Sequence, residues 1–277
     1  MTSFHSTVLT IEHDREAAVA TLWLDRAEAR NAMGPEFWAD LPQAVDALSV
    51  DEAVRAVVLA ARGPHFSVGL DLKAMGGALA GGPDGTSPAR RAAATRASIL
   101  RMQGAITAVA RCPKPVVAAI HGYCIGGGVD LVTACDVRLA SIDAVFSVRE
   151  TRMAIVADLG SLQRLPRIVG AGHVAELAFT GRDVDARRAA QIGLVNAVYE
   201  DVDALIAGAR SMAAEIGALS PIAVQGTKAV LAASDGRTVE EGLDFVAAWN
   251  AGMLVSDDLT EALTAFAEKR PPRFTGR

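Results

Sequence analysis

A buried-strand pattern that runs directly into a glycine-rich turn limits the fold of this chain more than any other feature. The apolar run Lys114–Ile120 has the length of a strand, and the glycines of His121–Asp130 follow it at once. They lead into a helix that begins near Gly127 or Gly128. Such a succession is typical of an α/β fold. Glycines at the turn let backbone N–H groups face a ligand, and the start of the helix favours negative charge there.

Three carboxylates lie in or after this turn, at Asp130, Glu150 and Asp158. Carboxylates beside a turn that stabilises negative charge can move protons to and from a bound ligand. Each also has a structural interpretation. Asp130 suits the first turn of a helix, Glu150 the exposed end of a strand, and Asp158 the cap of the next helix. Together, beside the glycines, the three predict an enzyme site.

A second glycine-bearing loop follows another strand candidate. Phe66–Leu72 places Gly69 at a turn after the apolar run Ala56–Ala60. Two backbone N–H donors, one from each loop, could therefore converge on one ligand oxygen.

Strand and helix patterns alternate up to about Ala140 and give way to helices after Gly160. The first part has expected strands at Val8–Ile11, Val19–Leu24 and Ala56–Ala60, and an expected helix at Pro35–Leu48. The second part has one expected strand, Leu194–Val198, and expected helices at Gly172–Phe179, Ala186–Gln191, Val202–Ile216, Ile222–Ala233, Val239–Leu254 and Leu259–Glu268. We therefore divide the chain into an α/β core at residues 1–170 and a mainly helical region at residues 171–277, packed tightly together.

The clearest loop runs from Gly76 to Pro88 and is rich in glycine and proline. The alanine-rich segment Ala89–Ala110 beyond it has the apolar spacing of a long helix. We expect a lid over a pocket in this part of the chain.

Composition argues against several other classes of protein. A chain of 277 residues with 51% hydrophobic content can bury a large core. Its net charge of -5 and lack of a basic run argue against a nucleic-acid-binding role. No apolar run approaches the ~20 residues of a membrane helix, and the amino terminus lacks a signal-peptide pattern. Neither the three cysteines nor the five histidines show metal-ligand spacing. We expect a cytoplasmic protein with reduced thiols and no metal.

Four motifs together resemble the crotonase (enoyl-CoA hydratase/isomerase) superfamily. They are Leu24–Met33 (LDRAEARNAM), Phe66–Asp71 (FSVGLD), His121–Asp130 (HGYCIGGGVD) and Phe266–Phe274 (FAEKRPPRF). The resemblance extends over roughly Val8–Phe274. It implies an α/β crotonase-like spiral of ββα units in two sheets, followed by a C-terminal helical region that supports trimerisation, often as a dimer of trimers.

The resemblance also assigns roles to the two glycine loops. It implies that the backbone N–H groups of Leu70 and Gly127 form an oxyanion hole for the carbonyl of a CoA thioester. The implied substrate-binding residues are Val68, Gly69, Leu70, Asp71, Leu72 and Gly127. It implies an acyl-CoA substrate and no separate cofactor, because CoA is part of the substrate. Neither nucleic acid nor a membrane is expected as a partner.

The carboxylates distinguish branches of the superfamily. Typical hydratases have glutamates at the positions of Asp130 and Glu150 and glycine at the position of Asp158. The Asp, Glu and Asp of this chain resemble Δ3,5-Δ2,4-dienoyl-CoA isomerases instead. Further stretches similar to that branch are Asp158–Pro166, Pro221–Lys228 and Asp244–Leu254.

The chemistry of that branch accounts for a third carboxylate. Conversion of a 3,5-diene into a 2,4-diene removes a proton at C2 and adds one at C6, so one carboxylate would have to reach two distant carbons. We expect Glu150 to remove the C2 proton, Asp158 to deliver the C6 proton, and Asp130 to set the charge and orientation of the pair. The expected activity is dienoyl-CoA isomerisation in fatty-acid β-oxidation.

Three alternatives remain open from the sequence. Asp130 and Glu150 alone could serve an enoyl-CoA hydratase or a 3-enoyl-CoA isomerase. A non-catalytic member that binds CoA esters or RNA would lack the carboxylates or carry a basic run. His65 and His121 have structural interpretations. Candidates for contact with the CoA phosphates, none of them assigned, are Arg26, Arg30, Lys73 and Lys269.

Overall fold

A six-stranded sheet forms the centre of the molecule in the computed structural model, which describes residues 4–79 and 87–277. Its strand order is β1-β2-β3-β4-β6-β9; β1 and β2 are antiparallel, and the other neighbours are parallel. These strands are β1 (Leu9–Asp14), β2 (Val19–Leu24), β3 (Ala56–Ala61), β4 (Val116–Ile120), β6 (Val137–Ser141) and β9 (Ala197–Tyr199). Parallel neighbours require crossover connections, which the helices supply.

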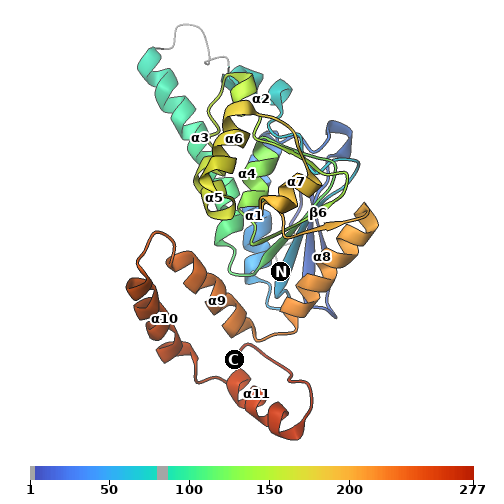
Figure 1. Ribbon diagram of the computed structural model, residues 1–277, viewed down its shortest axis with the longest axis vertical. Helices are drawn as coiled ribbons and strands as arrows, with labels where there is room; N and C mark the ends of the chain where they lie inside the picture. Colours follow the sequence, from blue (N-terminus) through green and yellow to red (C-terminus); the bar gives the residue numbers. More distant parts are fainter. Residues whose placement is uncertain (1–3, 80–86) are drawn as a thin grey trace.

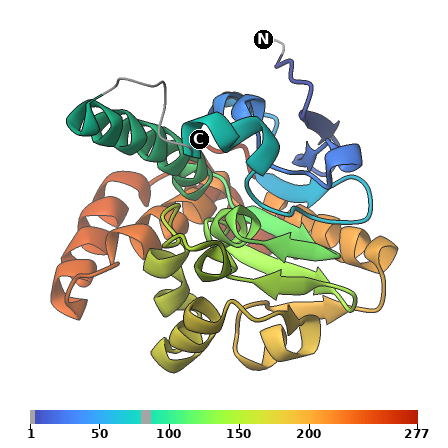
Figure 2. The ribbon, with the colours of Figure 1, turned by 90° about the horizontal axis from the view of Figure 1, so that it is seen from above.

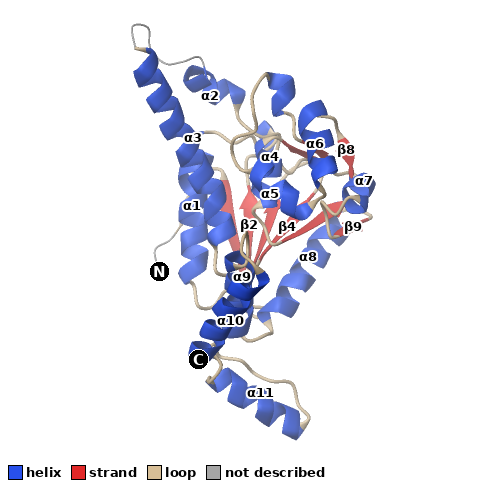
Figure 3. Cartoon of the chain, turned by 60° about the vertical axis from the view of Figure 1, so that its left-hand side comes forward, coloured by secondary structure: helices blue, strands red, loops and turns tan. Residues whose placement is uncertain are grey.

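The central strands are apolar on both faces because helices cover both faces. Every residue of β2, β3 and β4 is buried. Alternate residues such as Val58 and Val117 pack under α8 (Val202–Gly217), whereas Leu59 and Ala118 belong to the core on the opposite face. Figure 3 shows the sheet between α8 on one side and α1 (Pro35–Val50) with α3 (Pro88–Arg111) on the other. Continuous apolar runs are typical of such doubly covered sheets.

A smaller three-stranded sheet follows the order β5-β7-β8 and adjoins the glycine-rich turn. Its strands are β5 (Tyr123–Ile125), β7 (Val145–Ser147) and β8 (Val184–Asp185). Each of β4 and β6 is followed by a short strand of this second sheet, so the chain repeats strand, strand and helix as it winds around the core. Viewed from above, the strands lie at the centre of the body with helices around them (Figure 2).

The remaining helices surround or extend this core. They are η1 (Ala27–Ala29), α2 (Leu72–Leu79), α3 (Pro88–Arg111), α4 (Gly127–Thr133), η2 (Glu150–Met153), α5 (Ser161–Ile168), α6 (Ala171–Thr180), α7 (Ala186–Gln191), α9 (Pro221–Ala233), α10 (Val239–Met253) and α11 (Asp257–Glu268). Local chemistry sets several starts: Ser87, Asp185, Asp201, Ser220, Thr238 and Ser256 each cap a helix with their side chain.

The last three helices lie outside the body that contains the sheets (Figure 1). By contrast, α8 packs against the large sheet and β9 pairs with β6, although both follow residue 170. Elements from both predicted parts of the chain therefore contribute to the central layers. The helices that stand apart are α9, α10 and α11.

Most predicted elements are observed, with corrections at a loop and at a strand: the strand predicted at Leu194–Val198 is observed as β9, which begins only at Ala197. The long helix after Pro88 is confirmed as α3, and the turn into a helix at Gly127 is confirmed as α4. The loop predicted from Gly76 to Pro88 is wrong at its start, because α2 continues to Leu79 despite two glycines. Residues 80–86 of that loop lie outside the described residues. Tertiary context therefore outweighs the low helix propensity of glycine here.

Among the described residues, no single helix is long and apolar enough to cross a membrane. One bent pair, α8 with α9, reaches the required length and hydropathy together, but its two helices meet at 106°.

Candidate active site

The two glycine-bearing loops are joined by backbone hydrogen bonds. Ser67 N–H donates to Tyr123 O at 2.9 Å, and Ile125 N–H donates to Ser67 O at 3.0 Å. Gly69 has a φ of +83°, and a Cβ there would lie 2.7 Å from Ile125 O. Only glycine lets the loops approach this closely. The two loops are thus in direct contact, and the convergence of their N–H groups on one ligand oxygen stays a prediction.

Two N–H groups at this junction have no acceptor within the described part of the chain. They belong to Leu70 and Gly127, and a Cβ on Gly127 would lie only 3.8 Å from Leu70 N. The loop around Leu70 is held by Met33, whose N–H donates to Gly69 O at 2.8 Å and whose carbonyl accepts from Asp71 N–H at 3.1 Å. Two neighbouring N–H donors on fixed backbone can stabilise an oxyanion.

Asp71, predicted as a substrate-binding residue, is engaged by the protein itself. Its Oδ2 accepts from Arg26 Nη1 at 2.7 Å, and its Oδ1 accepts from the N–H groups of Lys73 and Ala74 at the start of α2. The Ala74 N–H and the Arg26 guanidinium lower the pKa of this carboxyl. Asp71 therefore fixes the start of α2 beside Leu70.

Asp130 is buried on α4 with one side-chain oxygen satisfied. Its Oδ1 accepts from Ser161 N–H at 2.6 Å, whereas its Oδ2 has no partner among the described residues. Burial raises the pKa of Asp130 to about 6; the Ser161 hydrogen bond opposes this effect, and the charge of Asp158 adds to it. The charge of Arg164 also opposes the rise, but burial outweighs it, and a buried carboxylate holds its proton more tightly.

Glu150 begins η2 and faces the glycine turn. Its Oε1 lies 3.4 Å from the place of a Cβ on Gly126, and its Oε2 is buried without a partner among the described residues. Burial raises the pKa of Glu150 to about 7, and the charges of Asp130 and Asp158 add to this effect. A carboxyl with a pKa near neutrality can act as either a general base or a general acid.

Asp158 lies half-buried before α5. Burial raises the pKa of its carboxyl, and its charge in turn raises the pKa values of Asp130 and Glu150. The structure therefore brings the three sequence-predicted carboxylates into one electrostatically coupled group. Clusters with perturbed pKa values beside oxyanion donors are typical of catalytic sites.

A hollow of about 770 Å³ adjoins the Leu70 loop. Three of the basic candidates, Arg26, Arg30 and Lys73, lie along it, and Lys269 instead ends α11. The two histidines have structural contacts: His121 Nε2 lies 2.8 Å from Gly63 O, and the ring of His65 stacks on Tyr123. Glu28 and Asp71 also line the hollow and both pair with Arg26, so its border is of mixed charge, with Arg30 and Lys73 as the remaining basic groups.

The comparisons with known proteins agree with this geometry. The family model described as enoyl-CoA hydratase/isomerase matches residues 14–277. The chain belongs to the enoyl-CoA hydratase/isomerase family. It is 45% identical to the peroxisomal Δ(3,5)-Δ(2,4)-dienoyl-CoA isomerase of Arabidopsis thaliana over 98% of this chain and 97% of that protein. It is 42% identical to the mitochondrial Δ(3,5)-Δ(2,4)-dienoyl-CoA isomerase of Dictyostelium discoideum over 96% of this chain and 90% of that protein.

Solved structures of this family have the same fold. A putative enoyl-CoA hydratase from Streptomyces coelicolor A3(2) superimposes with a TM-score of 0.88 at 33% identity, covering 100% of this chain and 96% of that one. The crotonase-like α/β spiral predicted from the motifs is confirmed.

Sequence reasoning missed several residues that hold this family's site together in the present chain. Ser161 donates to Asp130, and Asn31 Nδ2 donates to the carbonyls of Arg62 and His65. Asn31 adopts a φ of +53°, which asparagine tolerates better than most residues. Its place in the LDRAEARNAM motif was a usable signal. Nothing in the local sequence indicated the Ser161 contact.

Proposed function

We propose that the protein isomerises 3,5-dienoyl-CoA to 2,4-dienoyl-CoA in fatty-acid β-oxidation. The observation that carries this proposal is the coupled group of Asp130, Glu150 and Asp158, all with raised pKa values, beside two unengaged N–H donors. The similarity to dienoyl-CoA isomerases over nearly the whole chain supports it.

In the proposed reaction, the N–H groups of Leu70 and Gly127 bind the thioester oxygen. Glu150 takes the C2 proton, and the electron pair of that C–H bond delocalises through the diene to C6 and onto the thioester oxygen. Asp158 then gives its proton to C6, leaving double bonds at C2 and C4. Removal of one oxyanion donor costs about 3 to 4 kcal/mol of transition-state stabilisation in a comparable site.

Asp130 acts in this proposal through charge and position. It lies in the first turn of α4, which the Gly127 donor begins, and its charge raises the pKa of Glu150. A base whose pKa is near the working pH is strong enough to remove a C2 proton and is still ionised in a large fraction of molecules. The other proposed substrate contacts are Val68, Gly69 and Leu72, with Asp71 holding their loop in place, and the CoA end lies along the hollow that contains Arg30.

The direct test uses 3,5-octadienoyl-CoA and follows the absorbance of the conjugated 2,4-dienoyl product. We expect product formation by the wild type, and its loss in Asp158→Asn and in Glu150→Gln. Isomerisation that survives Asp158→Asn but not Glu150→Gln would overturn the division of roles. No product from the wild type would overturn the proposed function.

Hydration of a 2-enoyl-CoA is the second candidate. Asp130 and Glu150 together supply the two carboxylates that hydration needs, and the similar solved structure is titled a putative enoyl-CoA hydratase. A parallel assay with crotonyl-CoA distinguishes the two, because water addition removes the enoyl absorbance. Hydration without isomerisation would make Asp158 incidental.

We further propose that the protein is a homotrimer, or a dimer of trimers, assembled through the C-terminal helices. Large apolar side chains are exposed on these helices and the segments joining them, including Val239, Val255 and Phe266 at 81%, 94% and 85%. Exposed apolar patches on separate helices indicate a protein interface. Light scattering coupled to size exclusion measures the oligomer.

The compartment stays a prediction. The relatives are named peroxisomal in one organism and mitochondrial in another, whereas the sequence of this chain favours a cytoplasmic protein. Its three cysteines are buried and unpaired, which fits a reducing compartment.

A further inference from the structure

The four residues Asp158–Ser161 are held at three points of their backbone. Asp158 O accepts from Gln103 Nε2 at 2.6 Å, and Leu159 O accepts from Arg164 Nη1 at 3.3 Å. Ser161 N–H donates to Asp130 Oδ1 at 2.6 Å. The segment that carries Asp158 is therefore fixed at its carbonyls by Gln103 and Arg164 and at its last N–H by Asp130.

Helix α3 supplies two of the groups that hold this segment. Gln103 and Thr107 are four residues apart and so lie on one face of the helix. Thr107 Oγ1 accepts from Arg164 Nη2 at 3.2 Å, which ties the arginine to the same helix. The adjacent residues Ala105 and Ile106 are buried in the core, so this part of α3 is a firm support.

Gly160 makes room for the arginine. Its φ is +124°, and a Cβ there would lie 1.9 Å from Arg164 Nη1. The guanidinium thus occupies the space beside a turn that only glycine adopts without strain. Arginine is mostly exposed in proteins, yet burial lowers the pKa of Arg164, so the protein bears a desolvation cost to keep this group here.

We propose that Gln103 and Arg164 are positioning residues that set Asp158 at the far end of the substrate, where the C6 proton is delivered. This inference rests on the proposed isomerase function and deepens it. Neither residue has to touch the substrate. Both act on backbone carbonyls next to the Asp158 side chain, whereas Glu150 and the oxyanion donors belong to other segments.

This separation predicts that the two proton transfers can be uncoupled. If the Asp158 segment shifts, Glu150 still removes and returns the C2 proton, but delivery at C6 slows. Misplacement of a reacting group by about 1 Å can cost as much as 100-fold in rate. A general loss of folding would instead lower both steps together.

The experiment compares Gln103→Met with Gln43→Met in ²H₂O. Methionine keeps the length of glutamine and removes its amide donor. Gln43 is an exposed helical glutamine whose only hydrogen bond within the described chain is to Ala39 O, so its variant controls for the chemical change. Mass spectrometry measures the deuterium incorporated at C2 of the recovered 3,5-octadienoyl-CoA and the amount of 2,4-dienoyl product. The ratio of the two compares C2 exchange with completed isomerisation.

We expect the ratio of C2 exchange to product to rise about ten-fold in Gln103→Met, with kcat falling by a similar factor and KM unchanged. Arg164→Lys should retain more product formation than Arg164→Met, because lysine keeps a charged donor. An exchange ratio in Gln103→Met equal to that of Gln43→Met would overturn the positioning role while the isomerase function stands. A wild type that forms no 2,4-dienoyl product would overturn both.

Discussion

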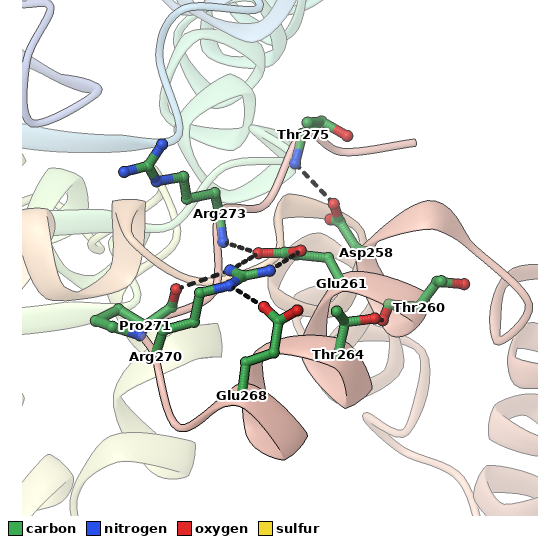
Figure 4. Close-up of polar contacts among 9 residues, drawn as sticks. All are labelled: Asp258, Thr260, Glu261, Thr264, Glu268, Arg270, Pro271, Arg273 and Thr275. Atoms are coloured by element: carbon green, nitrogen blue, oxygen red, sulfur yellow. Dashed lines mark hydrogen bonds and ion pairs between the residues drawn. The ribbon is translucent and has the colours of Figure 1, made fainter.

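Carboxylates in the core and carboxylates in the C-terminal helices have opposite surroundings. In the core, Asp130 Oδ2 and Glu150 Oε2 are buried without partners in the described structure, and the pKa values of these residues rise to about 6 and about 7. In the C-terminal region, Glu261 accepts from Arg270 at 2.6 and 3.0 Å and from Arg273 N–H at 2.7 Å (Figure 4). The Arg270 hydrogen bonds, followed by the Arg273 N–H, lower the pKa of Glu261 to about 2.

These residues are all carboxylic acids, so the difference between their pKa values comes from the surroundings of each one. A carboxylate with a guanidinium beside it stays ionised and ties segments together. A carboxyl whose burial outweighs its polar contacts holds a proton near neutral pH and can exchange it. The balance between burial and polar partners therefore separates the core carboxylates from those of the C-terminal helices.

The largest expected effect is on catalysis. Glu150→Gln should reduce kcat for isomerisation roughly 1,000-fold, since general base catalysis typically contributes 10²- to 10⁴-fold. Glu261→Gln, the same chemical change in the paired region, should leave kcat per folded subunit within a factor of two. Steady-state assays of both purified variants measure the contrast. Equal losses would mean that the two regions do not differ in role.

The next effect is on stability: Glu150→Gln should stabilise the fold, whereas most substitutions destabilise it. The folded-state pKa of Glu150 is about 7, above an unfolded value of ~4.3, so ionisation destabilises the fold as pH rises through this range. Allowing for partial exposure, Glu150→Gln should raise the free energy of unfolding by about 2 kcal/mol at pH 8. The gain should shrink by pH 5. Denaturant titrations at both pH values measure it, and a loss at pH 8 would contradict the uncompensated charge.

A smaller effect is expected in the pH profile of the wild type. Glu150 must be ionised to accept the C2 proton and Asp158 must be protonated to deliver one, so kcat/KM should follow a bell-shaped pH profile. Its acid side should rise about ten-fold per pH unit below pH 7 as Glu150 ionises, and its alkaline side should fall as Asp158 ionises. The measurement is the initial rate at low substrate concentration between pH 5.5 and 8. A flat profile over this range would show that the raised pKa does not govern the reaction.

The sequence predicted the framework of this site better than its details. The strand at Val19–Leu24 and the turn at Gly127 were predictable because burial pattern and glycine content are local signals. The strands β5 and β7 were missed because each has only three residues, too few for a period to be read.

Side-chain contacts between distant segments were not predictable. Gln103 and Asp158 are 55 residues apart, and nothing in either neighbourhood indicates that one holds the other. The resemblance marked the three carboxylates as a group, but their pKa shifts depend on burial and on the charges around them, which only the packed structure determines. Periodicity likewise could not show that α8 joins the sheet layers while α9 stands apart.

The smallest expected effect is on stability and concerns a carboxylate of the C-terminal region, Asp258. Asp258 accepts from Ser220 Oγ at 2.6 Å and from Thr275 N–H at 2.7 Å, and thereby ties the C-terminal tail to α9 and α11. Burial raises its pKa, but these bonds lower it more, so its contribution is present above its unfolded pKa and is lost in acid. Asp258→Asn should lower the free energy of unfolding by about 1 kcal/mol at pH 8.

Glu268→Gln is the control for this change, because Glu268 is exposed and pairs only with Arg270 within the described chain. Its effect on unfolding should fall below the measurement error, as is usual for exposed ion pairs. Amide exchange at Thr275 should quicken in Asp258→Asn and not in the control. At pH 8 the core variant Glu150→Gln and the tail variant Asp258→Asn therefore shift stability in opposite directions, because one removes a buried charge that lacks donors and the other a charge that accepts several hydrogen bonds. If both shifted it the same way, the supply of hydrogen-bond donors to each carboxylate would not be what separates the two regions.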